Sequence, residues 1–383
     1  MKLKPIFVLP ILLALALVVG GMFLIPRSGD PAPETTAPAT EPSETVEPTE
    51  EVSEEVTEEV TEEVTEEVTE AVTETVAENF DTFYTLTFVG DCTFGSAQAN
   101  WGYGSSFVQT VGDDYRYPFA NVAYIFENDD FTLANLEGPL TEVGEPAEKD
   151  FVFRGKPEYT AILTENGVEA VTIANNHILD YGYEGRTATR EVLDAAGVAY
   201  GAREESFLYT TESGLTVGVY CDDFAFDRTH IRESIAALRE QGAEIVVCAF
   251  HWGEERDYSP NQNEIDWGHI AIDAGADIVA GHHPHVLQSM EFYNGGLILY
   301  SLGNFAFGGN AYPSDMDTAI IQQQVVRASD GTVSLGELTV IPCSVSSVSS
   351  HNNFQPTPYE IGSEAYDRVL QKLMGTYVAP VVE

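Results

Sequence analysis

Short runs of apolar residues, each ending at a polar side chain, recur between residues 85 and 304. They alternate with segments whose apolar positions follow a helical spacing, at residues 183–196 and 234–241. Strands that alternate with helices predict a layered α/β domain. Domains of this class bind ligands at the carboxyl ends of their strands, so the polar side chains there are candidates for a site. The apolar runs span residues 85–91, 131–137, 169–174, 244–250, 277–280 and 297–300.

The pattern changes toward the C-terminus. Residues 318–348 are rich in β-forming residues interleaved with Gln and Ser, which predicts outer strands or strands of a second sheet. A helix is predicted over residues 363–374, with Ser363 as its N-cap and Gly375 as its stop. We therefore expect a folded domain at residues 80–350 and a C-terminal extension at residues 351–383, whose helix packs on that domain.

The first 27 residues have the pattern of a membrane segment. Lys2 and Lys4 precede a run from residue 5 to residue 26 that carries no charge and is long enough to span a bilayer. A cleaved signal peptide is the alternative, but the run is long for one and no small-residue cleavage site closes it. We favour an uncleaved transmembrane helix, with its basic end inside and the rest of the chain outside the cell membrane.

Residues 28–79 repeat Val, Thr and Glu and contain no Lys or Arg. Like charges four residues apart and the weak helix propensity of Thr and Val disfavour a helix, so we expect a disordered, extended acidic linker. The linker holds part of the formal net charge of −45, and the remainder of the chain is acidic as well. This charge excludes nucleic acid as a partner, and an anionic substrate would need metal cations to bind.

Three histidines lie within the segment from Asp277 to His285, in a chain with only 8 His among 383 residues. His283 and His285 occupy alternate positions and can direct two ring nitrogens at one point, an arrangement that suits zinc, manganese or iron. The other strand ends supply more metal ligands. Together the set fits two divalent ions that share a carboxylate or a water. Capping of a following turn is the alternative for Asp91 and Glu137. The predicted metal ligands are Asp91, Asn135, Glu137, Asn176, His251, His283 and His285.

A catalytic pair is predicted beside these ligands. His177 directly follows Asn176 and can protonate a leaving oxygen as a general acid. Asp180 lies three residues later and can hold the ring of His177. A structural or helix-capping role is the alternative for His177.

These residues belong to a series of motifs that spans residues 85–350 in order. The series is Gly90-Asp91, Asn135-Leu-Glu137-Gly, Ala174-Asn-Asn-His-x-x-Asp180-Tyr-Gly182, His251-Trp-Gly-Glu-Glu255, Gly281-His-His-Pro-His285 and Ser301-Leu-Gly-Asn-Phe305. It resembles that of the CapA family, the capsule-synthesis proteins associated with poly-γ-glutamate. That family is similar to the calcineurin-like metallophosphoesterases, so the resemblance implies an αββα sandwich of the metallophosphoesterase type.

The resemblance also implies how the ligands are divided and gives His177 the role of the acid. The first motif departs from the metallophosphoesterase pattern at Thr93, where the pattern has His. In the second motif, Asn135-x-Glu137 stands where the pattern has a bridging Asp. Carried over by position, the first ion would be held by Asp91 and His285, the second by Asn176, His251 and His283, and both by Glu137.

We therefore expect a cell-surface protein that takes part in the synthesis, export or anchoring of an anionic capsule polymer, of poly-γ-glutamate type. Its two-metal site is predicted to hydrolyse a phosphoester. The expected partners are the membrane, capsule-synthesis membrane proteins and the anionic polymer or phosphoester. One alternative is a non-catalytic component of a capsule-export assembly. Another is a glycan-binding module whose groove is lined by Trp101, Tyr103, Trp252 and Trp267.

Overall fold

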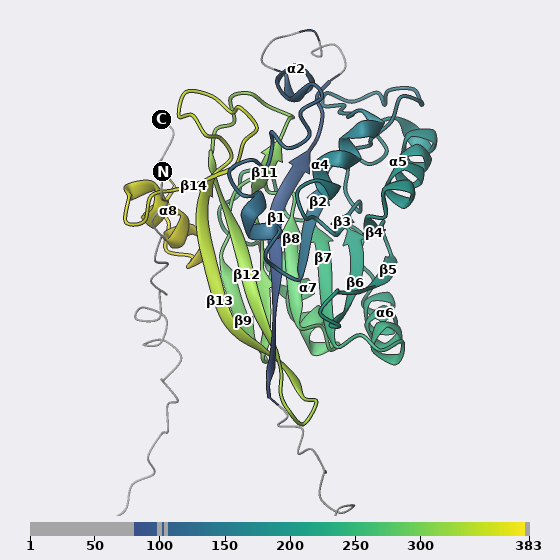
Figure 1. Ribbon diagram of the computed structural model, residues 1–383, viewed down its shortest axis with the longest axis vertical. Coiled ribbons are helices and arrows are strands. Elements are labelled where there is room, and N and C mark those ends of the chain that lie inside the picture. The colour runs from purple at the N-terminus through teal and green to yellow at the C-terminus, as the bar shows by residue number, and fades with distance from the viewer. Residues whose placement is uncertain (1–79, 98–101, 103–105, 380–383) are drawn as a thin grey trace, which may run out of the picture. The chain divides into compact units, whose positions relative to one another are not determined.

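The computed structural model describes residues 80–97, 102 and 106–379, and its strands form two sheets (Figure 1). The first sheet has the order β14 (Thr357–Pro358), β13 (Val333–Ser344), β12 (Asp317–Arg327), β1 (Thr82–Thr93), β2 (Phe131–Leu136), β3 (Ala170–Thr172) and β4 (Ala199–Gly201), and β11 (Asn304–Phe307) also pairs with β1. The second sheet has the order β5 (Glu205–Thr210), β6 (Thr216–Asp223), β7 (Ile245–His251), β8 (Ile278–His282), β10 (Gly296–Leu299) and β9 (Met290–Tyr293).

The two sheets pack face to face, and helices cover both outer faces. Inward-facing side chains of β1, β2, β6, β7, β8 and β10 form one apolar cluster between the sheets. A second cluster joins the first sheet to its covering helices, and a third joins the second sheet to α6 and α7. The domain is therefore a four-layer αββα sandwich. The helices on the first sheet are α2 (Phe107–Val111), α3 (Ala123–Phe126), α4 (Thr160–Thr164) and α5 (Gly182–Ala196), and those on the second are α6 (Arg228–Glu240) and α7 (Gln262–Asp273).

Parallel pairing brings the predicted strand ends to the same edge of each sheet. In the first sheet, β1 and β2 run parallel with Asp91 opposite Asn135. In the second sheet, β7 and β8 run parallel with His251 opposite His282. Because the sheets pack against each other, these two polar edges can meet in one place.

Strand β1 changes partner next to Asp91. It pairs with β12 as far as Phe88 and with β11 from Asp91 onward, with irregular register between them. A side chain on Gly90 could not be accommodated, since its Cβ would lie 2.0 Å from the carbonyl oxygen of Gly303. The Asp91 amide then donates to the same carbonyl at 2.8 Å. Glycine at position 90 thus lets the backbones approach closely enough to fix Asp91.

The structure corrects several sequence-based boundaries. Strand β1 continues two residues beyond Asp91, and Asn304 begins β11 in the first sheet instead of following β10 in the second. Helix α6 begins at Arg228, six residues earlier than predicted, because Asp227 caps a polar first turn that lacks the apolar spacing. Residues 318–348 form β12 and β13 on the outer side of β1, in agreement with the prediction of outer strands.

The C-terminal extension carries the predicted helix, α8 (Glu364–Leu373), with the side chain of Ser363 as its N-cap. Val369 and Leu373 of α8 pack into the cluster between the sheets, and the extension also contributes strand β14. Among the residues that the structure describes, no helix is both long and apolar enough to cross a bilayer. The membrane helix predicted at residues 1–27 and the linker predicted at 28–79 lie outside those residues.

Candidate metal centre

Two groups of metal-ligand atoms meet at Glu137. In one group Glu137 is joined by His251 and His283, and in the other by Asp91 and His285. Within each group, the ligand atoms lie within 4.8 Å of one another. An oxygen of Glu137 is 3.7 Å from Nε2 of His251 and 3.8 Å from Nε2 of His285. The structure therefore brings these five predicted ligands together, with Glu137 in the bridging position.

Asn176, the sixth predicted ligand, lies beside the His251 group. Its Oδ1 atom is 3.1 Å from Nε2 of His251, the ring nitrogen that also faces Glu137. Asn176 is exposed, whereas His251 and Glu137 are each only 1% exposed. The amide oxygen thus closes the solvent side of this ligand group.

Asn135 occupies a different kind of position. Its side-chain amide donates to Oδ1 of Asp91 at 2.8 Å, and its Oδ1 accepts a hydrogen bond from Asn175 at 3.0 Å. The same amide nitrogen is 3.4 Å from Nδ1 of His251. These contacts fit a residue that orients ligands better than a ligand itself, since its oxygen is already engaged. A direct bond from Asn135 to a metal stays a prediction.

The histidine turn after β8 has an unusual backbone. His283 has φ of 99° and His285 has φ of 58°, in the left-handed region that non-glycine residues rarely adopt. This backbone allows the amide of His283 to approach Oδ2 of Asp91 at 3.4 Å and brings Nδ1 of His285 to 3.2 Å from the same oxygen. The Pro between the two histidines therefore lies in a turn that directs both rings toward Glu137.

Burial shifts the pKa values of three of the ligands, Glu137, His251 and His283, and favours the uncharged form of each. Burial raises the pKa of Glu137 to about 7. Burial, together with the charge of neighbouring His283, holds the pKa of His251 well below its ordinary value, and burial lowers that of His283 to about 4. Both imidazoles are therefore neutral at neutral pH and keep a lone pair for a metal.

The other ligand group carries opposite charges. Burial alone would lower the pKa of His285, but the charge of Glu137 and the contact with Asp91 outweigh it and raise the pKa to about 9. Burial alone would raise the pKa of Asp91, but hydrogen bonds from His282 and His285 outweigh it and hold that pKa well below its ordinary value. In the absence of metal, a protonated His285 therefore serves as the counter-ion of Asp91 and Glu137.

Polar atoms without partners indicate that this arrangement suits metal ions. Within the described part of the chain, neither carboxylate oxygen of Glu137 has a hydrogen-bond partner, and neither has Nδ1 of His283. Buried polar atoms are almost always satisfied, and leaving them unpaired is destabilising. Carboxylate oxygens mixed with imidazole nitrogens are a donor set typical of zinc, manganese and iron sites. The residues present therefore fit divalent metal ions.

His177 and Asp180 form the predicted pair next to the ligands. Nδ1 of His177 lies 2.8 Å from Oδ2 of Asp180, which is fully buried and also accepts from the Phe153 amide at 2.6 Å. The ring of Phe153 packs against His177 with centroids 4.7 Å apart. Lys149, which the sequence analysis did not identify, bonds to the other oxygen of Asp180 at 2.5 Å and lies 3.3 Å from Nδ1 of His177.

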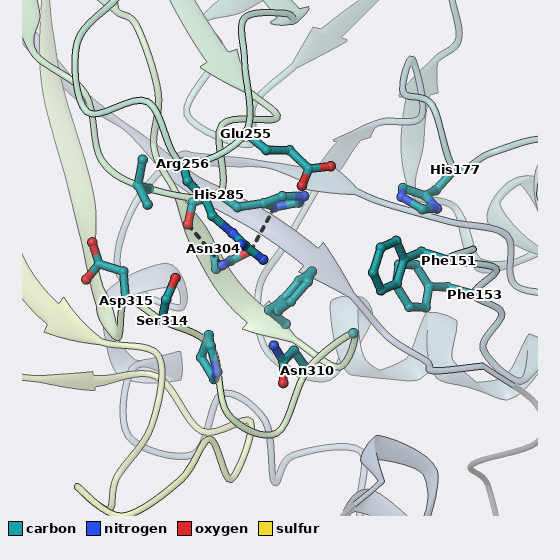
Figure 2. Close-up of a pocket in the computed structure, with 14 residues that line it drawn as sticks. Phe151, Phe153, His177, Glu255, Arg256, His285, Asn304, Asn310, Ser314 and Asp315 are labelled. Atoms are coloured by element: carbon teal, nitrogen blue, oxygen red, sulfur yellow. Dashed lines mark hydrogen bonds between the residues drawn. The ribbon is translucent and has the colours of Figure 1, made fainter. Parts of the chain in front are cut away.

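A pocket opens beside the metal ligands (Figure 2). Figure 2 shows three boundaries: His177 with Phe151 and Phe153, then Glu255 with Arg256, and then Asn310 with Ser314 and Asp315. His285 and Asn304 lie between these boundaries and connect the pocket to the ligands, with Asn304 Oδ1 3.0 Å from Nδ1 of His285. A substrate could therefore reach His177 and His285 from one cavity.

Several site residues were missed by sequence reasoning. His282 is 1% exposed and its Nδ1 lies 3.3 Å from Asp91, yet only the two histidines after it were predicted as ligands. Asn175 donates both to Asn135 and to the carbonyl of Leu136. The triple-histidine run and the Asn-Asn pair were visible in the sequence, but the direction of each side chain was not.

The proposed glycan groove has no support among the described residues. Trp252 is 2% exposed and packs among the aromatic rings beneath α6 and α7, with Trp267 against the same cluster. The indole of Trp252 donates to the carbonyl of Tyr300 at 2.8 Å. These two tryptophans stabilise the core, which was the alternative for them, and Trp101 and Tyr103 lie outside the described residues.

The fold and the site define a domain of αββα architecture with a candidate two-metal centre at its strand ends. The family model described as "Bacterial capsule synthesis protein PGA_cap" matches residues 85–221 and 202–309. This match covers more than half of the chain and includes every predicted ligand. The chain belongs to this family, the family of the CapA proteins, as the motif series implied.

Two curated relatives have related names. The chain is 30% identical over 267 residues to "Capsule biosynthesis protein CapA" of Bacillus anthracis, covering 62% of this chain and 63% of that protein. It is 30% identical over 275 residues to "PGA biosynthesis protein CapA" of Bacillus subtilis (strain 168), covering 66% of this chain and 70% of that protein. The chain thus spans about two thirds of the length of these relatives.

Similarity to solved structures is weaker. The NAD nucleotidase NadN of Haemophilus influenzae matches with a TM-score of 0.37 and 12% identity, over 77% of this chain and 63% of that chain. The purple acid phosphatase PPD1 of yellow lupin (Lupinus luteus) matches with a TM-score of 0.32 and 10% identity, over 74% of this chain and 58% of that chain. Similarities of this size establish neither an activity nor a metal content.

Proposed function

We propose that this chain is a metal-dependent hydrolase that cleaves a phosphoester during the synthesis, export or anchoring of an anionic capsule polymer. The observation that carries the proposal is the position of Glu137. This carboxylate is buried, lacks hydrogen-bond partners among the described residues, and belongs to both ligand groups. A shared, unsatisfied carboxylate between two such groups is what a two-metal site requires.

Asp91 and His285 would hold one ion, His251, His283 and Asn176 the other, and Glu137 both. Bound there, divalent ions would supply positive charge to an anionic phosphoester and lower the pKa of a water nucleophile. The chain has a formal net charge of −45 and would by itself repel an anionic substrate. Bound metal cations would provide the local positive charge that such a substrate needs. We propose a site of the calcineurin-like metallophosphoesterase kind, with manganese, zinc or iron.

His177 would supply a proton to the leaving oxygen. Its Nδ1 faces Asp180 at 2.8 Å, which leaves Nε2 as the ring atom available to a substrate in the pocket. Asp180 cannot rotate away, because it also accepts from the Phe153 amide and binds Lys149. A buried, fixed carboxylate behind the imidazole keeps the ring in one orientation, as general acid catalysis requires.

The test is hydrolysis of p-nitrophenyl phosphate and bis(p-nitrophenyl) phosphate by the purified full-length chain with Mn²⁺ or Zn²⁺. His177→Ala should lower kcat by roughly a hundredfold or more while metal content stays the same. His269→Ala is the matched control, because His269 pairs with Glu291 and stacks on Tyr293 away from the ligands. Absence of turnover with every metal, with His177→Ala behaving like the wild type, would refute the hydrolase.

We further propose that residues 1–27 anchor the protein in the cell membrane and that residues 28–79 hold the domain outside. The names of the two Bacillus relatives support a place in capsule synthesis, with capsule-synthesis membrane proteins as partners. Protease added to intact cells should release the domain if it faces outward. Retention of the full-length protein after this treatment, with cleavage only in lysed cells, would contradict the location.

Complementation of a capsule-deficient deletion strain distinguishes the hydrolase from the non-catalytic alternative. The wild-type allele should restore capsule, whereas His177→Ala and His251→Ala alleles, expressed at equal level, should not. Full restoration by both variants would favour an assembly component in which the metal site is dispensable.

A further inference from the structure

Helix α8 carries a buried lysine that the proposed chemistry does not use. The side chain of Lys372 is 1% exposed, and its ammonium group bonds to Asp315 at 2.5 Å and to Asp317 at 2.7 Å. Arg368, one turn earlier, makes a bidentate contact with Asp317 at 2.6 and 2.7 Å. A buried ammonium group is stable only when it is paired in this way, so the cluster holds α8 firmly against the start of β12.

One partner of Lys372 belongs to the pocket beside the metal ligands. Asp315, only 8% exposed at its side chain, lies in the segment from residue 309 to residue 315, which forms one pocket wall (Figure 2). The amide of Asp317 donates to Oδ1 of Asp315 at 3.0 Å, so this carboxylate is fixed from two sides. The ion pair with Lys372 therefore fixes the position of Asp315, the last residue of this pocket wall.

Lys372 also contacts the segment that forms the opposing wall. Its ammonium group lies over the ring of Tyr258 at 5.1 Å and over that of Tyr377 at 4.9 Å, within the range of cation–π attraction. Tyr258 comes two residues after Arg256, which with Glu255 lines the other side of the pocket. A single side chain thus ties together two segments that approach the pocket from different sheets.

Except for Tyr258, the residues that make these contacts lie outside the part of the chain that the family match covers. The family match ends at residue 309, whereas Asp315, Lys372 and Tyr377 all follow it. The metal ligands lie within the match, and one wall of the adjoining pocket lies beyond it. The same centre could therefore work on differently shaped substrates according to what closes this side.

We propose that Lys372 is a positioning residue that fixes the width of the pocket, so that α8 determines which group attached to the phosphate the site accepts. This inference rests on the proposed hydrolase function for its kinetic consequence, but the tie itself can be tested without turnover. The pocket lining combines Phe151, Phe153 and Phe307 with Arg256. It suits an organic substituent with an apolar face and a polar end.

Two variants remove different contacts between Lys372 and the pocket segments. Asp315→Asn removes the charge on the 309–315 wall and leaves the pairing of Lys372 and Arg368 with Asp317 in place. Lys372→Met removes the ion pairs with Asp315 and Asp317 and the contacts with the rings of Tyr258 and Tyr377. It carries a greater risk of unfolding, because two buried carboxylates lose a partner. Arg327→Met is the matched control, since Arg327 makes a comparable bidentate pair with Glu244 at the opposite end of β12.

Hydrogen exchange of the full-length chain is the first measurement and needs no activity. Asp315→Asn should speed exchange in residues 309–316, and Lys372→Met should do so in residues 255–258 as well, with β7 and β8 unchanged. Arg327→Met should leave both segments as in the wild type. Unchanged exchange in both pocket segments of folded Asp315→Asn and Lys372→Met would overturn the inference, whether or not the wild type is an enzyme.

The kinetic measurement compares bis(p-nitrophenyl) phosphate, whose second aryl group must enter the pocket, with p-nitrophenyl phosphate. Asp315→Asn should raise KM and lower kcat/KM for the diester by roughly tenfold relative to the monoester, because a displaced wall misplaces the larger substrate. Mn²⁺ affinity, measured by calorimetry, should not change. An equal loss on both substrates, or a parallel loss of Mn²⁺ binding, would indicate general damage and refute a role in specificity.

Discussion

Replacing Glu137 by Gln tests the proposed bridge without assuming any reaction. Burial raises the pKa of Glu137 from 4.5 to about 7 in the metal-free protein. A carboxyl group whose pKa is raised by folding contributes its full stability below pH 4.5, and this contribution is lost as the pH rises through about 7. Since one pKa unit corresponds to 1.36 kcal/mol, metal-free wild type at pH 8 should lose about 3 kcal/mol to this group.

Glutamine mimics the protonated carboxyl group and does not titrate, so Glu137→Gln should escape this loss. In EDTA, the variant should be more stable than wild type by on the order of 3 kcal/mol at pH 8 and by less than about 1 kcal/mol at pH 5. Saturating Mn²⁺ or Zn²⁺ should reverse the order, because metal binding stabilises only a folded state that has the bridging ligand.

The assay is urea unfolding of both proteins at pH 5 and pH 8, with EDTA and with metal. A parallel pH dependence of wild type and variant in EDTA would show that folding does not raise the pKa of Glu137. Equal stabilisation of both proteins by metal would show that the carboxylate is not a ligand. Either result would contradict the interpretation of Glu137 as the shared ligand of a two-metal centre.

Three further outcomes are expected. Asp180→Asn should lower kcat less than His177→Ala does and shift the pH–rate profile, because the ring keeps its general position but loses its fixed anionic partner; an unchanged profile would exclude Asp180 as the orienting group. His282→Ala should weaken Mn²⁺ binding by roughly tenfold in calorimetry, since His282 contacts Asp91 at 3.3 Å, and equal affinity would show that this contact is dispensable. Burial raises the pKa of Glu264 to about 7, so the thermal unfolding midpoint of wild type should fall between pH 5 and pH 8. Glu264→Gln should reduce this fall. A pH dependence equal to that of wild type would contradict the raised pKa of Glu264.

Much of the site could be predicted because its residues follow strands that are recognisable by themselves. Asp91, Glu137 and His251 each stand at or just beyond a buried apolar run, and parallel strands place such ends together. The resemblance to the family then assigned six of the seven predicted ligands to two ions and left Asn135 without an assignment. Neither signal depends on knowing which strands are neighbours.

What could not be predicted depends on long-range pairing. Whether β11 would join β1 or extend the second sheet is decided by the approach of Gly90 to Gly303, which no local pattern encodes. Lys149 lies in a polar loop without a regular pattern, and only the fold places it against Asp180. The same holds for Lys372, since a lysine on a predicted helix is ordinarily exposed, and its burial follows from carboxylates more than 50 residues away.

Several features that are unfavourable to the free energy of folding are concentrated at the candidate metal centre. His283 and His285 have left-handed backbones, and conformations of this kind cost of order 1–3 kcal/mol each. A few ångströms away, Glu137 is buried without a hydrogen-bond partner among the described residues. A fold retains such terms where a bound group offsets them, and the atoms concerned are those that a metal would engage. Metal removal should therefore loosen the turn after β8 more than any other part of the domain. Hydrogen exchange with and without EDTA would measure this change. Equal protection of the turn in both conditions would refute the link between backbone strain and metal binding.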